Sequence, residues 1–146
     1  MGNIQAAATV GASLDSMLAA FRADFIHSLG TAGAHSERTD PGRSGMEHRL
    51  VGAASDGAVL HVLTTRRART AEILVVRSNP EANLEARSRY ELEISPAGVH
   101  VIMRGTVIGD VDADGRGNQV AAADLRRVAA RARQLERSNI SDHEVD

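Results

Sequence analysis

Two segments with the periodicity of amphipathic helices enclose a run of short strand-like segments, and this order limits the folds open to the chain. In the first helical segment, apolar residues recur at the i, i+3, i+4 and i+7 spacing of one buried face: Leu14, Met17, Leu18, Phe21, Phe25 and Leu29. Ser13 can cap the start of this helix, and Gly30 can end it in a left-handed conformation. The spacing predicts a helix over residues 12–30, followed by a linker loop over residues 31–45 that is rich in glycine and polar residues.

Residues 46–111 have the short apolar runs and turn signals of a mainly antiparallel sheet of about five strands. Asp56-Gly57 is a strong signal for a two-residue hairpin, and residues 95–98 have the composition of a type I turn. The predicted strands are 47–54, 58–65, 70–77, 89–94 and a last one that starts at Val99 and runs to about 104, or through a bend to 111.

The segment 79–88 allows two interpretations. Asn79, Pro80 and Glu81 are typical of a helix start. From Leu84 onward, however, uncharged residues alternate with charged ones, as they do in a half-exposed strand. We favour a short helix that leads into a strand.

The final helical segment, residues 118–137, is the clearest element, and Asn118 can cap it. Its apolar residues step by four and three positions along one narrow stripe: Ala121, Leu125, Val128, Ala132 and Leu135. Arginines occupy most of the other positions and are expected to face water. The candidate partner-binding residues of this helix are Leu125, Val128, Leu135, Arg127 and Arg131. The short acidic tail, residues 138–146, is predicted to be disordered.

These elements predict one α+β domain over residues 1–146, with an N-terminal helix, the sheet and a C-terminal amphipathic helix. The core must be thin, because Phe21, Phe25 and Tyr90 are the only aromatic residues. A partner subunit often completes a thin core, so a homodimer is expected. Two central strand segments, 59–63 and 73–76, are apolar on both faces and therefore require two covers, one of which could be a second subunit.

The composition excludes several kinds of chemistry. All basic residues are arginine, and the chain contains neither lysine nor cysteine. A Schiff-base lysine, a P-loop lysine, a thiol nucleophile, a disulfide and a thiolate metal site are therefore excluded. The formal net charge of −2 and the scarcity of aromatic residues argue against nucleic-acid binding. Because no segment has the pattern of a signal peptide or a membrane span, we expect a cytoplasmic protein without a membrane partner.

Residues 110–118 contain the sharpest local motif, in which oxygen-bearing side chains alternate and Gly115 follows at the sixth position. The oxygen-bearing residues are Asp110, Asp112, Asp114 and Asn118. This stretch resembles the first nine positions of an EF-hand or dockerin calcium loop, which implies a Ca²⁺ site. Ala121 stands where those loops carry a bidentate acid, and the preceding residues are strand-like rather than helical. A polar turn that caps the last helix is the alternative, and in that case no cofactor is expected.

No set of residues defines a reaction. The six histidines lack metal-binding spacing, although His61 and His100 fall in the middle of strands and could approach each other across a sheet. The segment from Gly42 to Gly45 departs from the nucleophile-elbow motif. The sequence therefore favours a protein that is not an enzyme.

The expected order of elements resembles that of the small dimeric type III secretion chaperones, in topology alone. The resemblance implies a non-catalytic protein-binding or adaptor module that acts as a homodimer and recognises a protein partner through an apolar surface with arginines at its rim. Two alternatives stay open. One is a calcium-binding domain that uses residues 110–118. The other is a small-ligand or enzymatic α+β domain with a pocket between the sheet and the helices.

Overall fold

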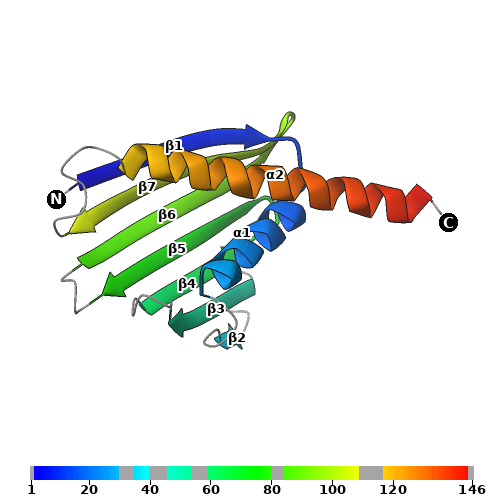
Figure 1. Ribbon diagram of the computed structural model, residues 1–146. Coiled ribbons are helices and arrows are strands. Elements are labelled where there is room, and N and C mark those ends of the chain that lie inside the picture. The colour runs from blue at the N-terminus through cyan, green and yellow to red at the C-terminus, as the bar shows by residue number, and fades with distance from the viewer. Residues whose placement is uncertain are drawn as a thin grey trace.

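The computed structural model describes residues 2–29, 35–39, 46–53, 59–79, 84–108 and 117–144. Within these ranges the elements are, in chain order, β1 (Gly2–Val10), α1 (Leu14–Leu29), β2 (His35–Thr39), β3 (Met46–Ala53), β4 (Val59–Arg66), β5 (Thr70–Asn79), β6 (Leu84–Ser95), β7 (Gly98–Ile108) and α2 (Gly117–Glu144). The strands form one antiparallel sheet in the order β1-β7-β6-β5-β4-β3-β2, and both helices lie across the same face of it (Figure 1). The predicted α+β class is confirmed, with seven described strands instead of about five.

Hairpins connect neighbouring strands where the turn signals predict them. The strands β3 and β4 pair on either side of Asp56 and Gly57, which themselves lie outside the described residues. Ser95 pairs with Gly98 at the tight turn between β6 and β7. Gly98 has a φ of 128°, and a Cβ atom there would lie 2.0 Å from the carbonyl oxygen of Val10. Only glycine fits this position, because any side chain would collide with the backbone of β1.

The strand β1 is an element that the sequence interpretation missed. It pairs along its whole length with β7, from Gly2 opposite Val107 to Val10 opposite Val99. Its even-numbered residues face the helices and its odd-numbered residues are exposed. The strand is rich in alanine, which has a low intrinsic preference for strands, so its pairing with β7 and its cover by α2 stabilise it instead.

The predicted linker over 31–45 is wrong for its described part, because residues 35–39 form the edge strand β2, which pairs with β3. The short helix favoured within 79–88 is also not found in the described residues. Asn79 is the last residue of β5, and β6 begins at Leu84, which pairs with it. The hydrogen bonds of the sheet outweigh the local preference for a helix start.

The last helix is longer than predicted. It continues to Glu144 instead of ending at residue 137, so the tail 138–146 is helical over most of its length. Extending an existing helix by one residue needs no new nucleation, which explains why a polar segment continues it. Its C-terminal turns project beyond the ends of the strands (Figure 1).

The hydrophobic core lies between the helices and the face of the sheet that they cover, which we call the inner face. Its most deeply buried large side chains are Met17, Ile73, Leu92, Val10, Val99 and Val101. The start of α1 is capped as predicted, since the Ser13 hydroxyl accepts a hydrogen bond from the Ser16 N–H at 3.1 Å. Among the described residues, no helix is long and apolar enough to span a membrane.

Two sets of polar contacts hold α1 and α2 together. The Arg127 guanidinium of α2 donates to the Asp24 carboxylate of α1 at 2.7 Å. Farther along α2, Glu136 accepts hydrogen bonds from the Ser16 hydroxyl at 2.6 Å and from the Ser13 N–H at 3.2 Å. These bonds, that from Ser16 first, lower the pKa of Glu136, because they stabilise the ionised carboxylate.

Neither of the two described helices lies over the opposite, outer face of the sheet, so the two covers expected for the central strands are not both supplied by these helices (Figure 1). Leu74 of β5 is 37% exposed on this face and is the exposed large hydrophobic residue of the described chain. Its neighbours on this face are the charged residues Glu72 and Arg89 and the apolar residues Leu63 and Val76.

Candidate functional site

The residues of the inner face are more deeply buried at one end of the strands than at the other. At the more deeply buried end, Val10, Val99 and Val101 are 1% exposed or less. Toward the other end, one row of paired residues crosses four strands: Ile4, Gly105, Ser88 and Val75. All four are only partly buried, although they lie in the central strands of the sheet. This row is therefore less deeply buried than the other end of the inner face.

Two residues of this row, Gly105 and Ser88, are small. A Cβ atom at Gly105 would lie 2.8 Å from the carbonyl oxygen of Arg87 and 3.1 Å from the Ser88 hydroxyl. It would also lie 3.4 Å from the Met103 side chain, so the absence of a Cβ atom at Gly105 allows β6 and β7 to approach each other closely. We call the surface formed by Val75, Ser88, Tyr90 and Gly105 the inner site.

Tyr90 is the largest side chain of the inner site. Its ring meets Phe21 of α1 edge to face, with 4.9 Å between the ring centroids, and Phe25 stacks behind Phe21. No described side-chain nitrogen or oxygen is fully buried without a hydrogen-bond partner. Because the Tyr90 and Ser88 hydroxyls have no partner among the described residues, both must keep contact with solvent.

The electrostatic surroundings keep the Tyr90 hydroxyl protonated. Burial of the ring raises the pKa of Tyr90 to about 12, and the carboxylates of Asp124 and Asp24 add to the increase. Arg127 opposes it only partly, since this guanidinium is bound by both carboxylates. At neutral pH, Tyr90 is therefore a neutral phenol that can both donate and accept a hydrogen bond.

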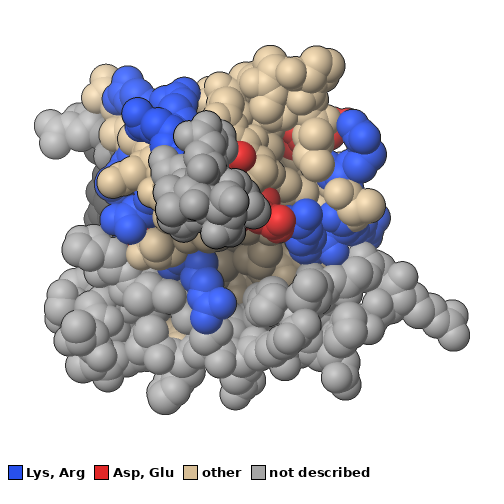
Figure 2. Space-filling view, turned by 90° about the vertical axis from the view of Figure 1, so that its right-hand side faces the viewer, with Lys and Arg blue, Asp and Glu red and all other residues tan. Residues whose placement is uncertain are grey.

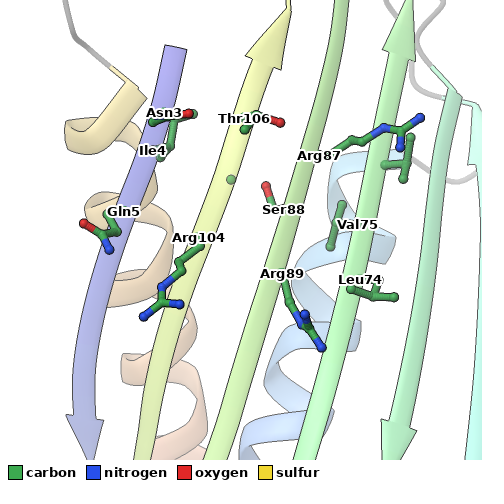
Figure 3. A pocket seen from close by; sticks show the side chains of 12 residues that line it. Asn3, Ile4, Gln5, Leu74, Val75, Arg87, Ser88, Arg89, Arg104 and Thr106 are labelled. Carbon is green, nitrogen blue, oxygen red and sulfur yellow. The ribbon is translucent and has the colours of Figure 1, made fainter. Parts of the chain in front are cut away.

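A second concave surface lies on the outer face. This outer groove has a volume of about 670 Å³. It is lined by Asn3, Ile4, Gln5, Leu74, Val75, Val76, Arg87, Ser88, Arg89, Arg104, Gly105 and Thr106. Figure 3 views it from the side opposite the helices, with the arginines on β6 and β7 and Leu74 on β5. Three of its lining residues are arginines and none is acidic.

The predicted partner-binding residues have mostly intramolecular roles. Leu125 and Val128 are 3% and 2% exposed, and Leu135 packs against the same core. This stripe of α2 contacts the chain's own core and presents no apolar surface to a partner. Arg127 is held by Asp24 and Asp124. Arg131 is exposed, as expected of an arginine that faces water.

The arginines form no continuous basic surface on the side of the molecule drawn in Figure 2. There they stand in separate groups among uncharged residues, with acidic residues between some of them. Arg66, for example, forms an ion pair with Asp15 at the start of α1.

The predicted calcium ligands Asp110, Asp112 and Asp114 lie outside the described residues. Asn118 belongs to the first turn of α2, but its side chain is also outside them. The remaining described residues contain no group of three or more acidic or histidine side chains that could hold a metal ion. A calcium site at residues 110–118 stays a prediction.

His61 and His100 do not approach each other. They lie on β4 and β7, which are separated by β5 and β6, so about 14 Å of sheet lies between them. Both face outward, away from the helices, and the His100 ring bonds the Thr9 hydroxyl at 3.0 Å. Neither histidine belongs to the inner site.

Sequence reasoning missed Tyr90 and Ser88 as site residues. The available signal was the alternation in β6, where Ser88, Tyr90 and Leu92 share one face and charged residues occupy the other. This pattern predicts a half-buried strand, but it does not reveal that the row beside Gly105 stays only partly buried.

No protein-family model and no curated protein sequence matches the chain. Its fold is similar to that of solved structures. The di-domain ARO/CYC StfQ from the steffimycin biosynthetic pathway matches 95% of this chain with a TM-score of 0.53 and 10% identity. The hypothetical protein jhp0584 from Helicobacter pylori matches 92% with a TM-score of 0.54 and 10% identity, and protein MLL2253 from Mesorhizobium loti matches 92% with a TM-score of 0.51 and 16% identity.

The chain spans about half of StfQ, 52% of its length, but 88% of jhp0584 and 96% of MLL2253. At these identities the likeness shows a shared fold. The fold corrects the predicted secretion-chaperone topology, which lacked β1 and β2. The protein-binding or adaptor function inferred from that topology is wrong, since the structural neighbours include an ARO/CYC protein. The alternative of a small-ligand or enzymatic domain agrees better with these neighbours.

Proposed function

We propose that the protein binds a small, largely apolar molecule at the inner site, between the sheet and the helices. The observation that carries the proposal is the pair of solvent-reaching hydroxyls, of Ser88 and Tyr90, on a face that is otherwise apolar. Ligand sites of this kind combine apolar walls with a few polar groups that fix the orientation of the ligand.

The walls of the site favour a flat or aliphatic ligand. Val75 extends the site on the sheet, and Phe25 lies on the helix side behind Phe21; both residues are partly buried against the core. Contact of a ligand with such side chains removes apolar surface from water and contributes about 25 cal/mol per Å².

The polar part of the ligand should be an uncharged carbonyl or hydroxyl group. A protonated Tyr90 can donate a hydrogen bond to a carbonyl oxygen, and Ser88, two residues away on the same face, is about 7 Å along the strand. The nearby carboxylates of Asp24 and Asp124 disfavour an anionic group at this position. The name of StfQ, an ARO/CYC protein of a biosynthetic pathway, agrees with a small organic ligand.

Binding of N-phenyl-1-naphthylamine, a neutral aromatic probe whose fluorescence rises in apolar surroundings, tests the proposal. The unmodified protein should bind it saturably. Ser88→Phe places a large ring in the partly buried row and should weaken binding about tenfold, or about 1.4 kcal/mol. The matched control is Glu93→Phe, the same substitution at an exposed outer position of β6, which should leave the affinity unchanged. Equal affinities of the two variants, with intact circular dichroism, would refute the inner site.

A further inference from the structure

We propose that the outer groove is a second ligand site, which binds a small amphiphilic anion, namely a phosphate or carboxylate group attached to a short apolar chain. The groove lies on the opposite face of the sheet from the inner site, and Leu74, Arg89 and Arg104, which carry the inference, do not belong to the inner site (Figure 3). The inference rests on three features of the groove: its charge, its apolar edge and the distance between them.

Of the three arginines in the groove, one has no acidic partner within the ranges that the structure describes. Arg89 is bound by Glu72 and lies 3.5 Å from Glu91, and Arg87 is bound by Glu85. Arg104 lies directly opposite Arg89 on β7 and is exposed. Within the described part of the chain, Arg104 has neither an ion pair nor a hydrogen bond.

Glu72 compensates the charge of Arg89, whereas Arg104, directly opposite Arg89, has no carboxylate of its own among the described residues. A phosphate or carboxylate offers the paired oxygens that a guanidinium binds in bidentate geometry. Asn3 and Thr106, which pair with each other next to Arg104, provide side-chain hydrogen-bond donors at the same end of the groove.

The apolar part of the groove is on β5. Leu74 is paired with Arg89, and it remains 37% exposed, while Val76 lies two residues farther along the same face. An exposed leucine on a central strand loses the stabilisation that a cover would contribute. An apolar chain placed against Leu74 and Val76 provides such a cover.

The apolar part and the cationic part of the groove lie close enough for one small ligand to contact both. Leu74, Arg89 and Arg104 form one row across three neighbouring strands. The row spans two strand spacings, so the leucine and the unpaired arginine are about 10 Å apart. A ligand that has an anionic head and an apolar tail of this length can contact both at once, which neither inorganic phosphate nor a neutral alcohol can do.

Titration with octyl phosphate, followed by calorimetry and by backbone amide shifts in NMR spectra, tests this inference. Octyl phosphate should bind and shift the amides of residues 74–76 and 104–106. Arg104→Gln should weaken the binding about tenfold, and Leu74→Ser should also weaken it. The matched control Arg133→Gln, at an exposed arginine of α2, should change nothing.

Three outcomes would overturn the inference. The first is that Arg104→Gln binds octyl phosphate as tightly as the unmodified protein does. The second is that inorganic phosphate binds as tightly as octyl phosphate. The third is that octanol binds as tightly as octyl phosphate. The Arg104→Gln variant separates the two sites, because it should weaken octyl phosphate binding and leave the affinity for N-phenyl-1-naphthylamine unchanged. If N-phenyl-1-naphthylamine fails to bind while octyl phosphate binds, the inner-site proposal fails and the outer groove stands.

Discussion

Tyr90 combines a buried aromatic ring with a polar hydroxyl group. Its ring contacts Phe21 edge to face, while its hydroxyl keeps contact with solvent. It is also the single tyrosine of a chain without tryptophan. Spectroscopic signals of tyrosine therefore report on the inner site alone.

The pKa of Tyr90 can be measured directly. Because burial raises it to about 12 in the folded protein, the near-ultraviolet absorbance of tyrosinate should rise with a midpoint well above the ordinary value of about 10. A raised pKa in the folded state means that the stability contribution is present below about pH 10 and is lost as the pH rises toward 12. A midpoint near 10 in a protein that still has its native circular dichroism would show that the ring is solvated.

At the level of single residues, the sequence predicted the Ser13 cap and the buried stripe of α2, because both depend on local spacing. It did not predict Ser88 as a site residue. Its partner in the row, Gly105, lies 17 positions away and becomes a neighbour only through the pairing of β6 with β7.

The helix α2 contacts both the sheet and the other helix. It covers β1, pairs with α1 through Arg127 and Asp24, and reaches the N-terminus of α1 through Glu136. A carboxylate near a helix N-terminus is stabilised by the helix dipole and by the free N–H groups there. Glu136 thus acts as a cap supplied to α1 by a helix distant in sequence.

Replacing Glu136 with glutamine should lower the free energy of unfolding at neutral pH by about 1 kcal/mol, because the hydrogen bonds lose their charge assistance. The pKa of Glu136 is lowered in the folded state, so its contribution is present above the unfolded value of about 4.3 and disappears as the pH falls through the folded value. Urea unfolding at several pH values measures this difference. A gap between the two proteins that persists in acid would assign the effect to side-chain packing.

The strands and helices with strong periodicity could be predicted from the sequence, including the hairpins and the antiparallel class of the sheet. The edge strands β1 and β2 could not, because alanine and polar residues carry little strand preference. The strand β1 pairs with β7, which is far along the chain, and β2 pairs with β3. The missing β1 also led to the wrong topology, and hence to the wrong function.

For the whole molecule, the main consequence of the architecture is that one sheet has two different faces. The inner face is covered by both helices and has neutral hydroxyls, whereas the outer face is open and has arginines (Figures 1 and 3). The strand β6 contributes to both, through Ser88 and Tyr90 on one side and Arg87 and Arg89 on the other.

The closure of the sheet by β1 can be tested with two neighbouring alanines. Ala8 packs against the core under α2, whereas Ala7 faces outward and is exposed. Ala8→Asp should lower the free energy of unfolding by about 2–3 kcal/mol, because it buries a charge. Ala7→Asp should change it by less than about 0.5 kcal/mol. Similar urea midpoints for both variants would show that β1 contributes little to the fold.

The pairing of β1 with β7 also has a consequence for biosynthesis. Val10 pairs with Val99 and Gly2 with Val107, so the partners are 89 to 105 residues apart. On the ribosome, the first strand is made early and has no partner until β7 has emerged, so its backbone groups stay exposed while most of the chain is translated. Closure of the sheet by β1 must therefore wait for the synthesis of β7, and the nascent protein depends on its alanine-rich strand β1 resisting aggregation until then.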